Sequence, residues 1–249
     1  MKCIIITKKH LAIIGSVILS FAMVLSVSAA AKTKLCPIYR VQTEQKLVAL
    51  TFDAAWGNED TEILCKTLKE NGATATFFLV GQWVDKYPES VRQIDGYGFE
   101  IGNHSNTHPY FSKISKNEIM AEVTACNDKI NAITGKTPSV FRMPYGDYNN
   151  TAVSTVSELN MYSIQWTCDS KDWMKNATAD SIVQNALKKL QPGSIILFHN
   201  AATYTPQALP EVIKRLKAQG YTFCTVSQLI YKDNYTVNHA GEQIKTAPQ

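Results

Sequence analysis

The stretch Leu47-Val-Ala-Leu-Thr-Phe-Asp53 is a short apolar run that ends in an acidic side chain. A run of this length, bounded by polar residues, predicts a buried β-strand rather than a helix. Similar apolar segments recur along the chain, and most are followed by a segment with helical periodicity or helix-capping residues. The predicted strands are residues 47–52, 73–80, 99–102, 140–142, 162–167, 194–198 and 221–225. Strands that alternate with helices in this way predict parallel βα units.

Predicted helices lie between these strands. The clearest begins at Ser115-Lys-Asn-Glu118, a capping-box pattern, and ends at Gly135. The others are residues 60–70, 87–95, 151–159, 179–190 and 209–219, with a short turn at 227–231. Seven or eight βα units close into a barrel whose active site lies at the carboxyl ends of the strands. The competing architecture is an open doubly wound sheet, but no G-x-G-x-x-G follows the first strand.

The domain organisation follows from this pattern. We expect one α/β domain over residues 47–232, a leader at residues 32–46 and a loose, polar C-terminal tail at residues 233–249.

The first 31 residues have the organisation of an export signal. Three lysines, Lys2, Lys8 and Lys9, precede the uncharged stretch Leu11–Ala31, which ends in small residues. This segment is either a cleaved signal peptide or an uncleaved membrane anchor. In both cases the rest of the chain is exported: it is secreted, associated with the cell wall or spore, or tethered to the outer face of the membrane.

Charge gives little support for a polyanionic partner. The same three lysines account for most of the net charge of +4, so the remainder of the chain is nearly neutral. A nucleic-acid partner and a polyanion-binding surface are therefore disfavoured. We expect a monomer that contacts the membrane only through its N-terminal segment.

Six cysteines occur in the chain, and Cys3 would be lost on cleavage of the signal. The others are Cys36, Cys65, Cys126, Cys168 and Cys224. Their number is odd, their spacing is wide and they form no C-x-x-C pair, which excludes a zinc ribbon and a small disulfide framework. One or two disulfides and buried free thiols both remain open.

Ionisable side chains stand at or just beyond most of the predicted strands. They are Asp53, His104, His108, Arg142, Asp169, Asp172 and His199. A structural core has no reason to collect such groups at strand ends, whereas barrel catalysis does. His104 and His108 are four residues apart, so on a helical turn both can bind one divalent ion. Because the pattern H-x-x-x-H is weak alone, surface or core histidines are the alternative.

Five segments resemble, in order, the motifs of the polysaccharide deacetylases (carbohydrate esterase family 4, the NodB homology domain). They are Thr51–Asp53, His104–Pro109, Arg142–Gly146, Asp169–Trp173 and Leu197–His199. Phe-Asp-Ala-Ala-Trp-Gly, Asp-Ser-Lys-Asp-Trp and the leader segment Ile38-Tyr-Arg-Val are more specifically similar to the sporulation branch of the family, the PdaB type.

This resemblance implies a distorted (β/α)7 barrel that removes N-acetyl groups from glycans with one divalent ion, usually zinc. His104 and His108 would be metal ligands, Asp53 the general base and His199 the general acid. Asp172 would hold His199, with Asp169 as the weaker candidate for this role, and Arg142 would orient acidic groups. The Tyr145 N–H would bind the oxyanion. Trp173 and Leu197 would form the walls of the acetyl pocket.

One position departs from the family pattern. The motif has a second acid directly after the base, and that acid is the third protein ligand of the metal, but here the residue is Ala54. Three interpretations follow. The enzyme works with a weakly held metal, or another acid such as Glu59 or Asp60 substitutes, or activity is lost.

The sequence therefore favours a metal-dependent hydrolase that removes N-acetyl groups from N-acetylglucosamine-type residues of peptidoglycan or a similar polymer. The absence of a G-x-S-x-G nucleophile elbow agrees with attack by water. The alternative is a catalytically weak or inactive barrel that binds glycan. A hydrolase of smaller amides is a third hypothesis, because fold does not fix substrate.

Overall fold

The computed structural model describes residues 34–247, and the fold is formed by the unit that starts at Leu35. The predicted signal peptide or anchor at residues 1–31 lies outside the described residues. None of the helices within residues 34–247 combines the length and the apolar character needed to cross a membrane.

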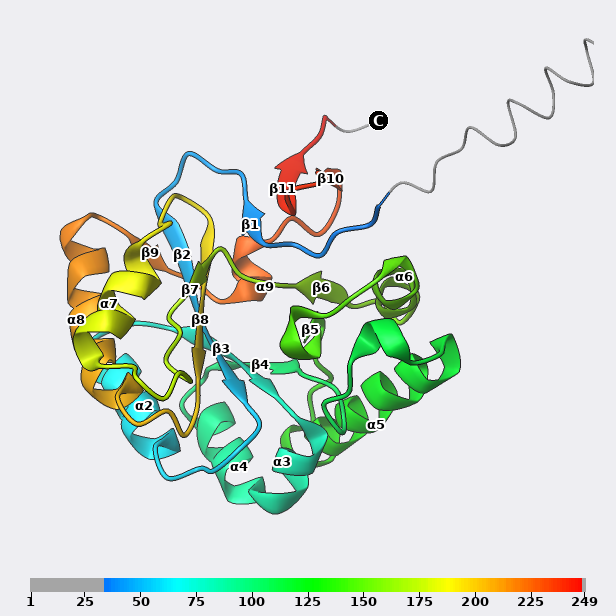
Figure 1. Ribbon diagram of the computed structural model, residues 1–249, viewed down its shortest axis with the longest axis horizontal. Coiled ribbons are helices and arrows are strands. Elements are labelled where there is room, and N and C mark those ends of the chain that lie inside the picture. Colours follow the sequence, from blue (N-terminus) through cyan, green and yellow to red (C-terminus); the bar gives the residue numbers. More distant parts are fainter. Residues whose placement is uncertain (1–33, 248–249) are drawn as a thin grey trace, which may run out of the picture. The chain divides into compact units, whose positions relative to one another are not determined.

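A curled, mostly parallel β-sheet with helices on its outer side forms the centre of this unit (Figure 1). Its strands are β1 (Arg40–Val41), β2 (Leu47–Ala54), β3 (Ala75–Leu79), β4 (Glu100–Asn103), β5 (Val140–Arg142), β6 (Tyr162–Ile164), β7 (Cys168–Asp169), β8 (Ser194–His199), β9 (Thr222–Phe223), β10 (Tyr235–Val237) and β11 (Glu242–Lys245). They are ordered β10-β11-β1-β8-β2-β3-β4-β5-β6, with β7 beside β8 and β9 beside β2. Only the pairs β1–β8 and β10–β11 are antiparallel. The predicted α/β fold class is confirmed.

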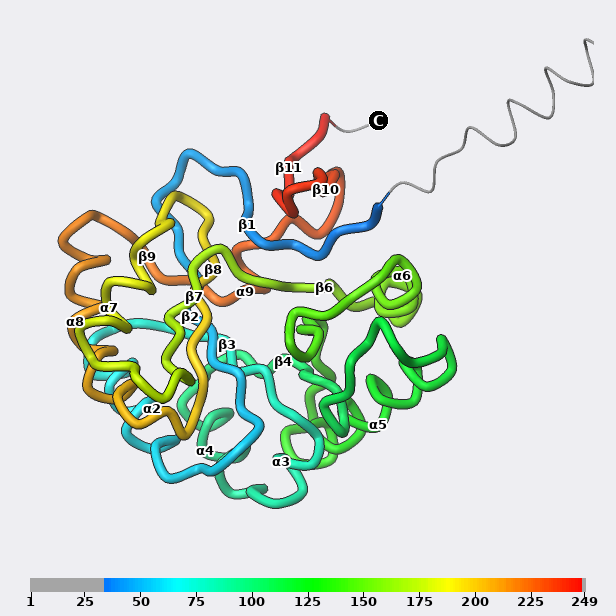
Figure 2. The backbone as a smooth tube through the Cα atoms, viewed as in Figure 1, coloured from blue at the N-terminus to red at the C-terminus, as the bar shows by residue number. Residues whose placement is uncertain are grey.

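Helices cover the outer side of the sheet, as the backbone traces in Figures 1 and 2 show. They are α2 (Thr61–Glu70), α3 (Gly81–Lys86), α4 (Pro88–Gly96), α5 (Lys116–Thr134), α6 (Asn150–Glu158), α7 (Ala179–Leu187), α8 (Thr205–Ala218) and α9 (Val226–Leu229). The predicted capping box is confirmed, since Ser115 and Glu118 exchange side-chain and backbone hydrogen bonds at the start of α5. Gly135 ends this helix in the left-handed conformation, with φ of 70°.

The alternation of side chains along β2 divides the core into layers. Val48, Leu50, Phe52 and Ala54 pack in an apolar cluster with residues of α2 and α8. Ala49, on the opposite face, packs in a separate cluster inside the curl. This period of two places the Asp53 side chain on the inner face, at the carboxyl end of the strand.

The leader joins the two ends of the curl. Ile38 forms a parallel bridge with Ile164 of β6, and two residues later Arg40 pairs with Ser194 of β8. The Gln165 N–H donates to the Ile38 carbonyl over 2.7 Å, and the Ile38 N–H donates in turn to β6. Residues 38–41 thus span the gap that β6 and β8 leave between them.

The expectation of a loose tail is wrong. Residues 235–237 and 242–245 form a hairpin whose second strand, β11, pairs in parallel with β1. The Gln243 side chain is fully buried, and it accepts from the Tyr231 N–H and donates to the Tyr231 carbonyl over 2.9 and 2.8 Å. A buried amide satisfied on both sides fixes the hairpin against the domain.

The five cysteines within residues 34–247 are free thiols. Burial raises the pKa of Cys65, Cys126 and Cys224 to about 12 and that of Cys168 to about 11. These four side chains are buried, so they behave as small apolar groups. Of the two interpretations that the sequence left open, the free-thiol one holds for the described residues.

Candidate active site

A cavity of about 430 Å³ opens at the carboxyl ends of the strands. Its lining contains eleven residues: Asp53, Ala55, Trp56, His104, His108, Tyr145, Trp166, Asp169, Trp173, Leu197 and His199. All of the site residues predicted from the sequence line this cavity except Arg142 and Asp172, which are buried behind it and contact lining residues.

Asp53 and Arg142 form a buried ion pair. Arg142 Nη1 donates to Asp53 Oδ1 over 2.6 Å, and the guanidinium lies 4.1 Å from the centre of the Phe78 ring. Burial alone would raise the pKa of Asp53, but the charge and hydrogen bond of Arg142 counter it, and this pKa lies below its ordinary value. Asp53 is therefore an ionised carboxylate, oriented by Arg142 and available to accept a proton through Oδ2.

His104 and His108 face each other through their Nε2 atoms, which are 3.2 Å apart. His104 Nδ1 lies 2.8 Å from the Arg142 carbonyl, which can only accept, so Nδ1 carries the proton and Nε2 presents a lone pair. Burial and the neighbouring His104 lower the pKa of His108 to about 3. Both rings are thus neutral imidazoles, the form that binds metal ions.

The two histidines fit a zinc site in part. Two imidazole nitrogens bound tetrahedrally at about 2.0–2.1 Å from zinc stand about 3.3 Å apart, close to the observed 3.2 Å. The Arg142 carbonyl fixes the ring of His104 as an outer partner of a metal ligand does. A third protein ligand is lacking, because no cluster of three or more His, Cys, Asp or Glu side chains within residues 34–247 could hold a metal ion.

His199 and Asp172 form a second pair across the cavity. His199 Nδ1 lies 2.7 Å from Asp172 Oδ1, and Asp172 Oδ2 accepts from the His199 N–H and from Thr205 Oγ1 over 2.8 and 2.7 Å. Burial would lower the pKa of His199, but the hydrogen bond and charge of Asp172 outweigh it and raise this pKa. Of the two candidates for this partner, the structure brings Asp172 to His199. Asp169 lines the cavity, and its Oδ1 accepts from the Lys171 N–H.

The family model for polysaccharide deacetylases matches residues 40–164. A peptidoglycan-N-acetylglucosamine deacetylase of Bacillus cereus is 34% identical over 186 residues, which cover 73% of this chain and 67% of that protein. The chain belongs to the polysaccharide deacetylase family. The peptidoglycan-N-acetylmuramic acid deacetylase PdaC of Bacillus subtilis is 35% identical, with 76% of this chain and 40% of that protein covered.

Solved structures of the family extend the comparison to active and inactive members. A Bacillus anthracis protein described as a CE4 family pseudoenzyme is similar with a TM-score of 0.75 and 35% identity, over 79% of this chain and 69% of that chain. A mutant of that pseudoenzyme with restored enzymatic activity gives the same TM-score. The chain spans 60%, 67% and 40% of the length of three curated relatives that it matches.

At the position where the family motif has its second acid, this chain has Ala54. Ala54 is buried in the outer apolar cluster, and Ala55 is the residue that lines the cavity after Asp53. Neither candidate substitute reaches the histidines. Asp60 Oδ2 accepts from the Ala201 N–H, and Glu59 Oε2 accepts from the Asn58 N–H; neither residue lines the cavity. The interpretation that Glu59 or Asp60 replaces the missing ligand is wrong for this structure.

Aromatic rings surround the mouth of the cavity. Tyr145 and Trp173 are 56% and 62% exposed, and Tyr145 contacts the His108 ring edge-on with 4.4 Å between ring centres. Tyr145 has φ of 60°, a left-handed conformation that turns the chain sharply over the histidines. Trp56, which is 57% exposed, completes the rim. Exposed rings at a cavity mouth suit the apolar faces of sugar rings.

Several contributors were not predicted as site residues from the sequence. Trp166 and Ala55 line the cavity, and Thr205 donates to Asp172. Asn200 binds the loop that carries Trp56, since its Oδ1 accepts from the Ala55 N–H and its Nδ2 donates to the Trp56 carbonyl. Asn200 directly follows His199, and this adjacency is the one signal that could have identified it.

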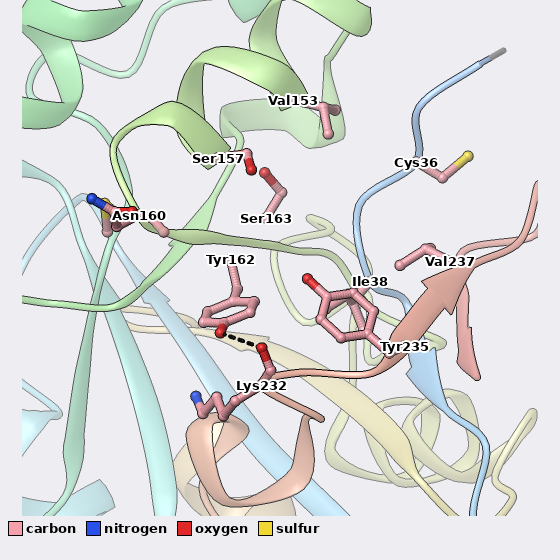
Figure 3. A pocket seen from close by; sticks show the side chains of 11 residues that line it. Cys36, Ile38, Val153, Ser157, Asn160, Tyr162, Ser163, Lys232, Tyr235 and Val237 are labelled. Carbon is pink, nitrogen blue, oxygen red and sulfur yellow. Dashed lines mark hydrogen bonds between the residues drawn. The ribbon is translucent and has the colours of Figure 1, made fainter. Parts of the chain in front are cut away.

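A separate cavity of about 310 Å³ lies between β6, β10 and the leader (Figure 3). Tyr162 and Lys232 line it, and the Tyr162 hydroxyl donates to the Lys232 carbonyl over 3.0 Å; Cys36, Ile38 and Tyr235 also line it. None of the predicted site residues borders this cavity.

Proposed function

We propose that this chain is a metal-dependent hydrolase that removes N-acetyl groups from N-acetylglucosamine-type residues of cell-wall or spore peptidoglycan. One observation carries the proposal: an ionised carboxylate, two facing neutral imidazoles and an acid-paired histidine line the same cavity. Hydrolysis of an amide needs these elements, because a water must lose a proton and the leaving nitrogen must gain one.

Asp53 acts as the general base. Arg142 holds one carboxylate oxygen, which leaves Oδ2, 3.4 Å from His104 Nε2, to accept the proton of the attacking water. The lowered pKa of Asp53 keeps it ionised at neutral pH. The buried guanidinium also stabilises the charged form against the cost of burial.

His199 acts as the general acid. Its raised pKa, caused by Asp172, favours the protonated ring despite burial. Asp172 accepts at Nδ1, so the proton to be delivered is carried by Nε2. The Thr205 hydroxyl and the His199 N–H hold the carboxylate in place, which fixes the ring that it orients.

His104 and His108 would hold the divalent ion, which we expect to be zinc. An ion bound there supplies a water of lower pKa and a polarised amide carbonyl. The Tyr145 N–H assists at the developing oxyanion. Trp173 and Leu197 wall the pocket for the acetyl methyl group, where their apolar surfaces exclude water.

The proposal also covers the location of the substrate and the branch of the family to which the chain belongs. Relatives carry the names of peptidoglycan deacetylases, so we place the substrate of this chain in the cell wall, outside the cytoplasm, with export by the N-terminal segment. We also retain the PdaB-type sporulation branch as a proposal, on the segments Phe52–Gly57 and Asp169–Trp173.

A second candidate function is glycan binding without turnover. It is favoured by Ala54, which removes the third metal ligand, and by the similarity to a family pseudoenzyme. It predicts that His199→Ala leaves glycan affinity unchanged, because a binding protein needs no general acid.

Acetate release from N-acetylglucosamine oligomers and from purified peptidoglycan decides between the two. We expect release that increases with added Zn²⁺ or Co²⁺ and falls to background with a chelator. His199→Ala and Asp53→Asn should lower the rate at least about 100-fold. No acetate under any added divalent metal, with glycan binding retained, would overturn the deacetylase and support the binding protein.

A further inference from the structure

A second cavity adjoins the active-site cavity. It has a volume of about 730 Å³, and we call it the lateral crevice. Its lining consists of Tyr39, Arg40, Trp166, Thr167, Cys168, Asp169, Lys171, Asn185, Lys188, Lys189, Gln191, Ala240 and Glu242. Trp166 and Asp169 line both cavities. A molecule bound at the active site can therefore extend into the crevice.

The walls of the crevice come from distant parts of the chain. One wall is formed by β7, the end of α7 and the residues directly after each of them, which include Lys171, Lys188 and Lys189. The other is formed by β1 and β11, which supply Arg40 and Glu242. Strand β7 pairs with β8, the strand that ends at His199 (Figures 1 and 2), so one wall of the crevice includes a direct neighbour of the strand that carries the proposed acid.

Positive charge in the crevice is not neutralised. Arg40 and Glu242 pair with each other. Lys171, Lys188 and Lys189 have no ion-pair partner among the described residues, whereas several lysines elsewhere do. Asp169 is the one remaining acid of the lining, and its Oδ1 accepts a backbone N–H. Three ammonium groups without an ion-pair partner thus line a crevice beside the active-site cavity.

We propose that the lateral crevice binds the carboxylates of the peptide part of peptidoglycan while the glycan occupies the active-site cavity. This rests on the proposed function in its peptidoglycan form. A polymer of N-acetylglucosamine alone is neutral and offers the three lysines no partner. A sugar that bears an acidic peptide does offer one, and the amides of Asn185 and Gln191 supply donors and acceptors for its backbone.

The test compares two ligands that differ only in charge. The first is a disaccharide–tetrapeptide with free carboxylates, and the second is the same molecule with its carboxylates amidated. Binding to the full chain is measured by calorimetry for the wild type and for the double variant Lys188→Ala/Lys189→Ala. We expect about fivefold weaker binding of the free acid by the variant, and no change for the amidated ligand or for an N-acetylglucosamine tetramer.

The matched control is Lys214→Ala/Lys217→Ala on α8, which removes two exposed lysines remote in sequence from the crevice lining. It should bind both peptides as the wild type does. Equal loss of affinity for the charged and amidated ligands, or equal loss in the control, would overturn the proposal.

Failure of this proposal is distinguishable from failure of the deacetylase. Charge-dependent binding without acetate release keeps the crevice assignment and rejects turnover. Acetate release with the same KM for charged and amidated substrates in wild type and variant rejects the crevice and keeps turnover.

Discussion

The Asp172 carboxylate accepts three hydrogen bonds, from the His199 ring, the His199 N–H and the Thr205 hydroxyl. Two of these donors, the His199 N–H and the Thr205 hydroxyl, take no part in proton transfer and hold the carboxylate in place. The consequence is that the orientation and the charge of the proposed acid depend on one buried side chain. Substitution of Asp172 tests this dependence directly.

Asp172→Asn should lower acetate release at least about tenfold and move the alkaline limb of the pH–rate profile to lower pH. The reason is that the carboxylate raises the pKa of His199, and the amide does not. The pH–rate profile is measured with and without the substitution. An unchanged alkaline limb would show that His199 is not the titrating acid.

The pair of His199 and Asp172 also makes the stability of the fold depend on pH. Because the folded-state pKa of His199 is raised, the pair stabilises the fold below the ordinary histidine pKa of about 6.5, and this contribution is lost as pH rises through the folded-state value. Asp172→Asn should therefore lower the melting temperature more at pH 5.5 than at pH 9. An Asp128→Asn variant, which neutralises an exposed carboxylate on α5, is the control.

Ala55→Asp should strengthen zinc binding at least about tenfold, because Ala55 lines the cavity with the two histidines and a carboxylate there completes a three-ligand site. Calorimetry with zinc measures the affinity. Ala54→Asp is the matched control: Ala54 is the motif position but faces the outer apolar cluster and is 1% exposed, so this variant should lower the melting temperature without a comparable gain in zinc affinity. If neither variant binds zinc more tightly than the wild type, the missing carboxylate is not what limits zinc affinity.

At the scale of the elements, the leader and the hairpin β10–β11 complete the sheet that the βα units begin. Leader residues 38–41 bind β6, β8 and β11. The turn before β8 is built closely against this segment. A Cβ at Gly193, whose φ is 78°, would lie 1.8 Å from the Val41 carbonyl oxygen.

Gly193→Ala should therefore destabilise the fold by about 3 kcal/mol or more, through both the strained φ and the clash. Gly98→Ala separates the two causes, because Gly98 has φ of 81° with no atom within 4 Å of its Cβ position. Its cost should be about 1 kcal/mol. Urea unfolding measures the free energy of unfolding of both variants. Equal losses would show that the leader moves away from the new Cβ at no cost in stability.

At the scale of the whole molecule, the free thiols report on its packing. In the native state Cys36 should react with a maleimide, and Cys65, Cys126, Cys168 and Cys224 should react only on unfolding, since burial suppresses their thiolates. Mass spectrometry assigns the label to each residue. Rapid labelling of Cys126, which is fully buried in the outer cluster, would contradict the packing described here.

Much of the fold and of the site could be predicted because their signals are local. Apolar runs gave the core strands, the Ser115–Glu118 spacing gave the start of α5, and the strand-end residues Asp53 and His199 lie on adjacent, paired positions of β2 and β8. Parallel strands bring their carboxyl ends together, so the sequence order of the polar groups was enough to place them at one edge.

The rest could not be predicted because its causes are not local. Residues 38–41 and 235–245 are too short and polar to read as strands, and their partners lie far away in the chain. The net charge is likewise a sum over the whole chain. Acidic side chains elsewhere cancel the charges of Lys188 and Lys189 in that sum, so it gives no sign that these two lysines lack ion-pair partners. That Ala54 faces the helices while Ala55 faces the cavity required the strand register.

The pairing of β1 with β11 also has a consequence for the time course of folding. Arg40 and Glu242 lie at opposite ends of the described chain, so their contact closes a loop of nearly the whole domain. Loop closure of this length slows folding, and the last contacts form only when the C-terminal residues are free to return. Strand β11 thus cannot pair with β1 until the last residues of the domain have been synthesised, so the sheet is completed only after translation of the domain has ended.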